Sequence, residues 1–424
     1  MTTTFTLVLN GDRLNHNLAQ LAKIGKLPQG GVRRLAYSPE DLMARQLVQD
    51  WMVEAGMSVR VDAAGNIIGT YAGEQEGVPT LATGSHVDTV PSGGRYDGAL
   101  GVVAGIEVVR VLRENNVRLA HPLEVIVFTD EEGAMIGSKA MSGTVVNDPE
   151  YYRREDGTSI QTCLKRLGGN WEQLVTAQRN RTEIAAFVEL HVEQGGVLDS
   201  LSHDIGIVEG VVSQHRYAIA IIGRPNHAGT TPMHLRRDAL VAASHIVLAV
   251  QALAKDTPGE QVATVGALQV WPNAANIVPG QVEMTVDIRD LSLTKIEQLV
   301  EQLEQQLRAI ASTTQTEITM KPILSVAPTL AVPQVKEAIA TTCQQLGLSY
   351  SYLPSRASHD AQEIGRFTDM GIIFVPSAAG ISHSEDEYTS PEQCTQGANV
   401  LLQTLLQLDK IAPATTVLPD VIPD

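Results

Sequence analysis

Histidines and carboxylates follow apolar segments of this chain at short spacings. His86 and Asp88 stand two residues apart in GSHVDTV, and Asp97 follows between glycines in GGRYDG. Residues two apart on an extended segment face the same way, so Asp88 is expected to hold the ring N–H of His86 and leave the other nitrogen free for a metal ion. The two oxygens of Asp97 could bridge a pair of cations. This region therefore predicts a metal site.

A second set of residues extends this donor group. Glu131 and Glu132 are adjacent in TDEEG, and neighbours on an extended segment point opposite ways, so one can bind metal while the other faces a water molecule. His191 in ELHVEQG and His383 in GISHS add imidazoles. This mixed N/O set suits zinc, manganese or cobalt better than calcium. A single histidine after a strand is more often a core residue, so the prediction depends on all these segments converging.

The elements that would bring the segments together read as an α/β fold. Residues 67–71, 80–83, 124–129 and 186–190 read as buried strands, and residues 100–112 read as a helix. An earlier helix begins at Ser38 and Pro39 and stops at Gly56. This alternation favours a mostly parallel, doubly wound sheet. Such sheets bind ligands beyond the carboxyl ends of their strands, which is where the histidines and carboxylates fall.

The order of expected strands and helices changes at Ser213, and the earlier alternation of strand and helix returns after Pro328. Between them the pattern predicts strand, helix, two strands, helix and strand, the βαββαβ order of a ferredoxin-like α+β domain. The expected ranges are residues 216–222, 237–255, 262–270, 282–288, 294–311 and 317–321, with Pro322 ending the last strand. A helix at 334–346 and a strand at 372–375 follow. The chain is therefore predicted to form a catalytic domain from residues 1–212 and 329–424, with residues 213–328 inserted as a second domain.

Composition excludes several classes of function. The chain of 424 residues carries 48 Asp and Glu against 31 Lys and Arg, a formal charge of -17, so neither nucleic acid nor an anionic membrane is an expected partner. Its 3 cysteines are far apart, which fits neither a disulfide framework nor a zinc knuckle. Residues 1–10 lack the features of a signal peptide, and the apolar run at 239–254 is interrupted by polar residues. We expect a cytoplasmic protein.

Read in order, the motifs resemble a known family. SHVDTV, GGRYDGALGV, TDEEG, ELHVEQG, NHAGTTPM, NAANIVPG, DIRD, SHDA and GISHS are similar to the hydantoinase/carbamoylase branch of the M20 metallopeptidase superfamily, over about residues 30–407. This branch includes N-carbamoyl-L-amino acid hydrolases, allantoate amidohydrolases and β-ureidopropionases. His191 is informative because M20 peptidases usually carry a carboxylate at that position.

The resemblance implies a mixed-sheet di-metal catalytic domain with an inserted lid domain that also forms a homodimer. Two divalent ions per subunit are implied, zinc or manganese, with cobalt or nickel as alternatives. Glu131 would act as the general base. The implied ligand sets are His86, Asp97 and His191 for one ion, and Asp97, Glu132 and His383 for the other.

The resemblance also implies substrate contacts. His227 in PNHAG would stabilise the oxyanion, from the same subunit or from its partner. Arg289 in DIRD would bind a substrate carboxylate through two parallel hydrogen bonds, and Asn276 in NAANIVPG would be a second contact. Gln194 would bind the ureido group.

The SHDA segment contains two further candidate site residues, and the residues just before it differ from the sequence usual in the family. His359 and Asp360 are expected to support the metal ligands. Just before them, Arg356 in SRASHDA stands where the family usually has a glycine-rich SGAGHDA-like stretch. Arg356 adds bulk and positive charge near the expected pocket.

The expected reaction is hydrolysis of the C–N bond of an N-carbamoyl-L-amino acid, which releases the amino acid, CO2 and ammonia. The first alternative is an allantoate amidohydrolase, since allantoate also carries a carboxylate beside a ureido group. A β-ureidopropionase, a dipeptidase and a non-catalytic small-molecule binder are further alternatives. Glu131 argues against the binder, which has no use for a base beside metal-held water.

Overall fold

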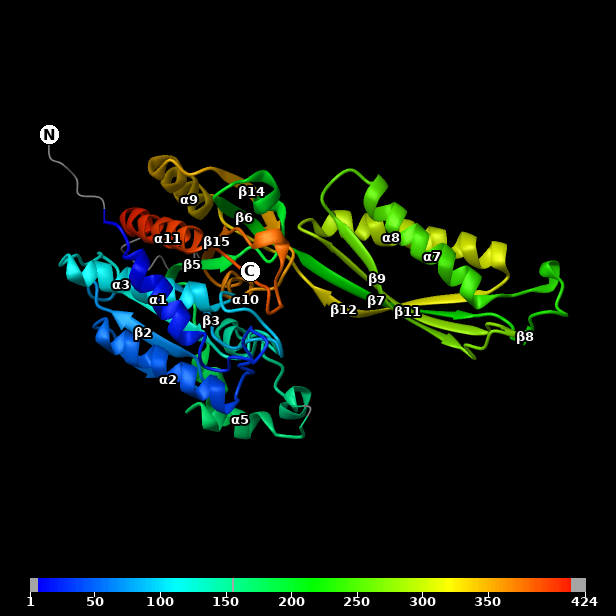
Figure 1. The fold of residues 1–424 in the computed structure, drawn as a ribbon, viewed down its shortest axis with the longest axis horizontal. Coiled ribbons are helices and arrows are strands. Elements are labelled where there is room, and N and C mark those ends of the chain that lie inside the picture. The colour runs from blue at the N-terminus through cyan, green and yellow to red at the C-terminus, as the bar shows by residue number, and fades with distance from the viewer. Residues whose placement is uncertain (1–6, 155, 413–424) are drawn as a thin grey trace, which may run out of the picture. The chain divides into compact units, whose positions relative to one another are not determined.

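The chain folds into two compact units, which the computed structural model describes over residues 7–154 and 156–412 (Figure 1). Unit 1 is formed by Met1–Gly210 together with Leu330–Asp424, and unit 2 by Val211–Thr329. Unit 2 is therefore inserted into the sequence of unit 1.

Unit 1 is built on a large mixed sheet. In the described part of the chain its strands lie in the order β1-β2-β4-β3-β5-β15-β6-β13, and β14 pairs with β6. The strands are β1 Ser58–Val61, β2 Ile67–Tyr71, β3 Thr80–His86, β4 Leu123–Phe128, β5 Ile184–Val192, β6 Ile205–Val211, β13 Thr329–Leu330, β14 Tyr350–Ser355 and β15 Asp369–Val375.

The centre of this sheet is parallel and its flanks are antiparallel. β3 pairs in parallel with β4 and β5, and β5 with β15. The pairs β1–β2, β2–β4 and β6–β15 are antiparallel. The mixed-sheet α/β class is thus confirmed. The parallel strand pairing expected from the alternation of strands and helices is found only at the centre of the sheet. β1 and β2 follow each other after a short turn, and a short turn allows only antiparallel pairing.

Helices cover the sheet of unit 1 and enclose its core. β4 and β5 are buried along their whole length, as strands covered on both faces must be. Helices α1, α3, α9 and α11 share one large apolar cluster with these strands, whereas α10 packs against α4, β5 and β15. The helices are α1 Gly11–Leu21, α2 Pro39–Glu54, α3 Ala99–Glu114, α4 Ile136–Ser142, α5 Ile160–Arg166, α6 Val197–Leu201, α9 Pro333–Leu346, α10 Asp360–Ile364 and α11 Pro391–Ile411, with 3-10 turns η1 Pro149–Tyr152, η2 Trp171–Ala177 and η4 Ala378–Gly380.

Unit 2 is an antiparallel sheet with two helices on one face. Its strand order is β12-β7-β11-β9, and α7 and α8 pack on it around a separate apolar cluster. A small pair, β8 with β10, extends beyond the sheet. The elements in chain order are β7 Ser213–Ile222, β8 Asn226–His227, η3 Met233–Leu235, α7 Ala239–Asp256, β9 Val262–Trp271, β10 Ile277–Val278, β11 Gln281–Asp290, α8 Leu293–Thr314 and β12 Glu317–Val326.

The expected end of the last strand at Pro322 is wrong. β12 continues to Val326, and its register against β7 shifts between Pro322 and Leu324. β12 lies at the edge of the sheet, where a residue without an N–H is tolerated at an irregularity because no outer strand needs that donor.

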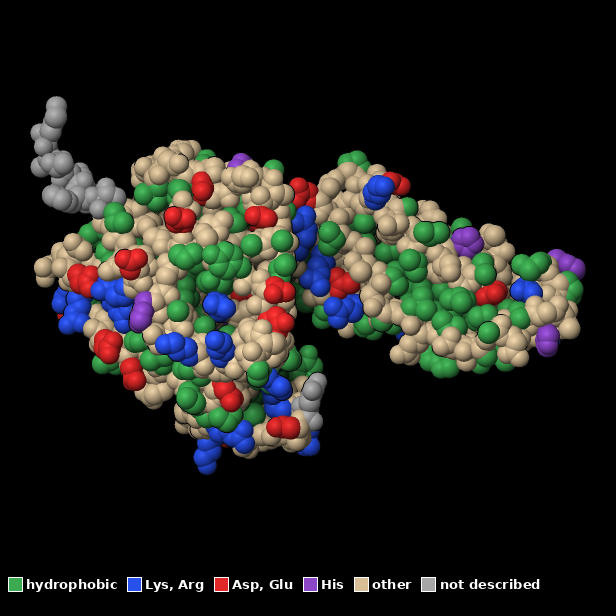
Figure 2. All heavy atoms as spheres, in the orientation of Figure 1, with side chains coloured by type: hydrophobic (Ala, Val, Ile, Leu, Met, Phe, Trp, Pro, Cys, Tyr) green, Lys and Arg blue, Asp and Glu red, His purple; other side chains and the backbone are tan. Residues whose placement is uncertain are grey.

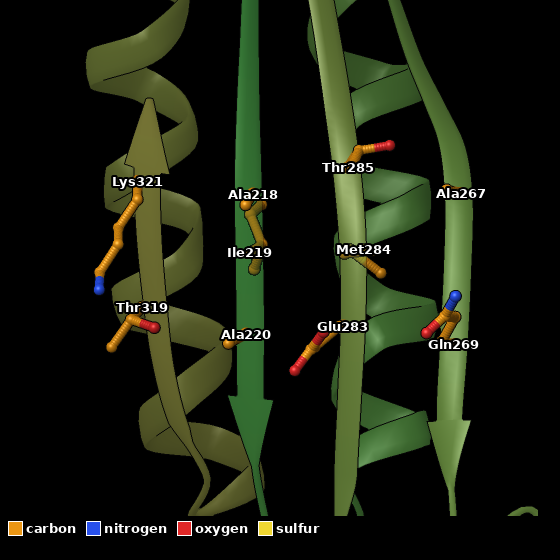
Figure 3. A pocket seen from close by; sticks show the side chains of 10 residues that line it. All are labelled: Ala218, Ile219, Ala220, Ala267, Gln269, Glu283, Met284, Thr285, Thr319 and Lys321. Atoms are coloured by element: carbon orange, nitrogen blue, oxygen red, sulfur yellow. The ribbon is translucent and has the colours of Figure 1, made fainter. Parts of the chain in front are cut away.

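Two surfaces of unit 2 differ in character. The open face of the sheet carries a hollow of about 300 Å³ over small side chains such as Ala218, Ala220 and Ala267, with Glu283 and Lys321 beside them (Figure 3). None of the predicted site residues lines it. On the other face, α7 is the one described helix long and apolar enough, with a mean hydropathy of 1.4, to cross a membrane, a test that core helices of soluble proteins also pass.

Candidate metal centre

The parallel strands of unit 1 deliver the predicted donors to one edge of the sheet. His86 is the last residue of β3, and His191 lies one residue before the end of β5. Glu131 and Glu132 follow β4 closely, and Asp97 precedes α3. Because β3, β4 and β5 run in parallel, their carboxyl ends meet, which explains how residues far apart in sequence converge.

Asp97 lies at the centre of the cluster. Its Oδ1 atom is 3.3 Å from Nε2 of His86 and 3.3 Å from Nε2 of His191. Its Oδ2 atom is 3.4 Å from Nε2 of His383, which is itself 3.4 Å from Oε2 of Glu132. The described residues form three groups of potential ligand atoms, each within 4.8 Å: Asp97 belongs to the two that hold the predicted ligands, and the third joins Glu189, His191 and His359. One carboxylate is thus shared by two adjacent donor sets, an arrangement that fits a pair of cations.

Glu131 lies beside these groups without belonging to either. Its Oε2 atom is 3.5 Å from Nε2 of His86. Glu132 points to the second group, so the adjacent carboxylates diverge. The arrangement can hold cations and still leave one carboxylate for proton transfer.

Backbone carbonyls fix the two buried histidines. Nδ1 of His86 lies 3.0 Å from the carbonyl oxygen of Asp88, and Nδ1 of His191 lies 2.9 Å from that of Val192. The expected contact from the Asp88 carboxylate is longer, at 3.9 Å, because this side chain instead accepts a hydrogen bond from the backbone N–H of Glu132. Asp88 therefore ties the Glu131–Glu132 segment to the His86 segment. Both histidines turn Nε2 toward Asp97.

Special backbone conformations hold several of these residues. Gly98 has a φ of +64°, and a Cβ there would lie 2.5 Å from the His86 ring, so only glycine fits. Asp130, Gln194 and His383 have φ values of 60°, 58° and 52°. Non-glycine residues in this region are strained and cluster at functional sites. The clustering here supports a functional interpretation of this sheet edge.

The buried carboxylates of the cluster would be stabilised in their ionised form by a nearby positive charge. Burial raises the pKa of Glu131 well above its usual range, against the opposing charge of His86. Burial likewise raises the pKa of Glu132 to about 7. Burial works against ionisation of Asp97, yet hydrogen bonds with His191, His383 and His86 hold the pKa of Asp97 well below its usual range. A cluster of carboxylates and imidazoles is the donor set that divalent metal ions bind, so the residues present fit such ions.

Two carboxylates that sequence reasoning did not select also support the cluster. Glu387 accepts hydrogen bonds from the backbone N–H groups of Tyr96 and Asp97, and its Oε1 atom would collide with a Cβ at Gly94. Glu387 therefore fixes the backbone that carries Asp97. Its sequence context, SEDEYTS, looks like an ordinary acidic surface loop, and only the glycine pair of GGRYDG hinted at a close neighbour.

The second is Glu189, which is fully buried. It accepts a hydrogen bond of 2.7 Å from Ser85 and one of 2.9 Å from the backbone N–H of Ala361. It links β3, β5 and the start of α10. Because it lies two residues before His191, the alternation of a strand places it on the same face, which was the available signal.

The SHDA residues and Gln194 lie close to the donors. The ring of His359 packs edge-on against His191 with centroids 4.5 Å apart, and among the described residues its Nε2 finds no hydrogen-bond partner. Asp360 is fully buried, and this burial, together with the negative charge of Glu189, raises its pKa. Nε2 of Gln194 donates to Oδ2 of Asp97 at 2.8 Å. Burial raises the pKa of Glu193, and the charge of the nearby Arg356 opposes that effect.

The other predicted substrate residues belong to unit 2. His227 pairs with Ile277 across β8 and β10, and the carbonyl of Asn276 accepts from Ala228, so His227 and Asn276 share one tip of the unit. Nδ1 of His227 accepts from the backbone N–H groups of Gly229 and Thr230, at 3.0 and 3.2 Å.

Arg289 lies elsewhere in unit 2, near the last residue of β11. Its Nε donates to Oδ1 of Asp287 at 2.7 Å, and Arg216 binds the other oxygen of the same carboxylate. β11 is 10 residues long and begins just after β10. At about 3.4 Å per residue, the tip with His227 and the end with Arg289 are roughly 30 Å apart. The structure does not bring these two predicted substrate contacts together within one chain.

Comparison with known proteins gives the same assignment as the motifs. The family described as "Peptidase family M20/M25/M40" matches residues 82–407. The chain belongs to the M20/M25/M40 peptidase family. It is 40% identical over 406 residues to an N-carbamoyl-L-amino acid amidohydrolase of Geobacillus stearothermophilus, covering 95% of this chain and 99% of that one. It is 36% identical over 394 residues to an allantoate amidohydrolase of Bacillus subtilis, covering 92% and 95%.

A solved amidase structure has the same fold. The crystal structure of an amidase of the hydantoinase/carbamoylase family from Burkholderia multivorans matches with a TM-score of 0.89 at 35% identity, covering 95% of this chain and 98% of that one. The resemblance to the hydantoinase/carbamoylase branch is thereby confirmed. The protein is a hydrolase of the carbamoylase type, which acts on non-peptide C–N bonds.

Proposed function

We propose that this M20 enzyme hydrolyses N-carbamoyl-L-amino acids with two divalent metal ions, releasing the amino acid, CO2 and ammonia. The observation that carries the proposal is the shared carboxylate of Asp97 between two donor groups, with Glu131 beside them and outside both. His86, Asp97 and His191 would hold one ion, and Asp97, Glu132 and His383 the other. The relative from Geobacillus stearothermophilus, named for this reaction, supports the substrate class.

The reaction needs a nucleophile and a proton donor at neutral pH. When bound, the two ions would acidify water and polarise the ureido carbonyl, whether zinc, manganese, cobalt or nickel fills the site. Glu131 accepts the proton of the attacking water and passes it to the leaving nitrogen. Burial raises the pKa of Glu131 above its usual range, which makes its carboxylate a stronger proton acceptor for this exchange.

His227 is suited to bind the oxyanion. Its Nδ1 accepts two backbone N–H groups and therefore carries no proton, so the neutral ring has its proton on Nε2. That N–H is a donor held in one tautomer, as oxyanion stabilisation requires. Asn276, on the same tip, is the second contact.

Arg289 and Gln194 would bind the two ends of the substrate. The guanidinium of Arg289 already holds one carboxylate, that of Asp287, so a substrate carboxylate would join or replace it. Gln194 lies against Asp97 and would donate to the ureido oxygen. His359 and Asp360 would keep His191 and its neighbours in place.

We further propose that the enzyme acts as a homodimer through unit 2. Because His227 and Arg289 of one chain are roughly 30 Å apart along β11, a substrate that meets both must draw them from two chains. An exposed surface supports this contact: β9 is an edge strand, with Trp271 40% exposed, and α7 exposes Leu248 at 62%. Figure 2 shows hydrophobic side chains gathered on the visible face of this unit.

The three cysteines, all buried and free, favour a cytoplasmic location.

A substrate screen tests the proposed function. Protein stripped with a chelator and reloaded with manganese or zinc is incubated with N-carbamoyl-L-amino acids, their D-enantiomers, allantoate and a dipeptide panel, and ammonia or amine release is measured. We expect turnover of the L-carbamoyl compounds by the reloaded protein and none by the stripped protein. Faster turnover of allantoate would assign the enzyme to that substrate instead, and tight binding without product would reject catalysis.

A further inference from the structure

A strained residue precedes the candidate base. Asp130 has a φ of 60° and is almost fully buried. Its carbonyl accepts from Met135 at 2.7 Å, and its Oδ2 accepts from the backbone N–H of Ala134 at 3.2 Å. A Cβ at Gly133 would lie 2.4 Å from Oδ1, so the loop closes tightly around this side chain. The Asp130 side chain thus organises the turn that presents Glu131 and Glu132.

A cation from outside the metal centre holds this side chain. Nη1 of Arg154 donates to Oδ1 of Asp130 at 3.1 Å, and the Arg154 side chain is 31% exposed whereas that of Asp130 is 2% exposed. The guanidinium carbon also lies 5.2 Å from the ring centre of Tyr37, which is itself buried and has a φ of 67°. The pair is therefore shielded on one side by an aromatic ring, where ion pairs are screened less than at an open surface.

Arg154 belongs to a separate part of unit 1. It follows the 3-10 turn η1, whose Tyr152 packs against Trp171 in a small apolar cluster. The same cluster includes Tyr37 and Ile136, and Ile136 begins the helix after the Glu131 loop. Arg154 thus connects a peripheral apolar cluster to the turn that carries the base.

We propose that Arg154 is a positioning residue for the reaction: through its ion pair with Asp130 it keeps the strained turn in the conformation that directs Glu131 toward the metal centre. A left-handed aspartate persists only where its surroundings hold it. Without the guanidinium, the buried Asp130 carboxylate lacks its counter-charge, and relaxation of the turn moves Glu131. A shift of about 1 Å in a catalytic group can reduce turnover by about 10²-fold.

The test compares two adjacent arginines. Arg154→Met removes the pair, and Arg153→Met is the matched control, because Arg153 is exposed and pairs with Glu150 at the surface. We expect Arg154→Met to lower kcat by about 10- to 100-fold with KM within about twofold and full metal content, and Arg154→Lys to recover part of kcat. Arg153→Met should behave as wild type.

Two further measurements separate positioning from general destabilisation. Asp130→Asn combined with Arg154→Met should lose less than the product of the single losses, since both break one pair. Hydrogen exchange of the backbone amides in residues 129–137 should accelerate in Arg154→Met and not in Arg153→Met.

Equal kcat in Arg154→Met and Arg153→Met would overturn the proposal, as would loss of metal content in parallel with activity or unchanged exchange in the turn. The proposal takes Glu131 as the base and so rests on the proposed function. The two are distinguishable: an active Glu131→Gln would reject the proposed function, whereas the exchange measurement tests Arg154 without any turnover.

Discussion

Mixing two inactive variants tests whether one substrate meets two chains. His227→Ala would remove the proposed oxyanion donor, and Arg289→Ala would remove the proposed contact to the substrate carboxylate. β11, which separates them, has 10 residues and spans roughly 30 Å. An N-carbamoyl amino acid is about as long as two residues of extended chain, about 7 Å. In a hybrid dimer, one site therefore receives both substitutions and the other site receives neither.

The recovered activity follows from this geometry. Each variant alone should retain less than about 1% of wild-type kcat/KM, since loss of one oxyanion donor costs about 10²- to 10³-fold and loss of a charge-assisted contact a comparable factor. When the two are refolded together in equal amounts, half of the dimers are hybrids with one intact site. The mixture should then show about a quarter of wild-type activity.

The assay is ammonia release at substrate concentrations below KM. The control mixture pairs His227→Ala with Asn276→Ala, whose residues share one tip of unit 2, so no intact site forms and no activity returns. Absence of recovery in the first mixture, although hybrid dimers are demonstrated by native mass spectrometry, would refute the two-chain site.

Three other predictions concern the metal centre. Glu131→Gln should reduce kcat by about 10³-fold or more and leave metal content unchanged, which turnover and metal analysis check together. Gly98→Ala should weaken metal binding because its Cβ meets the His86 ring, whereas Gly347→Ala, with a similar φ of +69° and nothing within 4 Å, should only lower the unfolding temperature. Burial raises the pKa of Glu132 from its ordinary 4.5 to about 7, so between these pH values the folded metal-free protein keeps a proton that the unfolded chain loses. The stability of the metal-free protein should therefore fall as pH rises from 4.5 to about 7. Over the same pH range, the increase in unfolding temperature on adding metal should grow. A constant gain across this pH range would contradict the last prediction.

The sequence predicted the elements that carry strong local signals. Ser38 caps α2 and accepts from Asp41, with Pro39 in the first turn, as the pattern indicates. The buried central strands were recognisable as continuous apolar runs, but such runs do not reveal the direction of the flanking strands, so the antiparallel edges were missed. α11 was also missed, although Ser390 and Gln393 form a capping box at its start.

The candidate site was accessible to sequence reasoning only in part. Donors such as His86 and His191 sit at strand ends, where periodicity places them. The ring contact of His86 with a backbone carbonyl could not be predicted, because side-chain spacing does not distinguish a carbonyl from a neighbouring carboxylate. Glu387 and Arg154 act through long-range contacts from segments that resemble ordinary surface loops, and such contacts have no local signature.

The central claim, that one carboxylate joins two cations, is tested most directly by metal stoichiometry. Wild-type protein and Asp97→Asn are dialysed against increasing concentrations of manganese or zinc until binding saturates, and bound metal is counted per chain. The account predicts two ions in the wild type, and at most one weakly held ion when Asp97 cannot bridge. Two tightly bound ions in Asp97→Asn, or fewer than two in saturated wild-type protein, would contradict it.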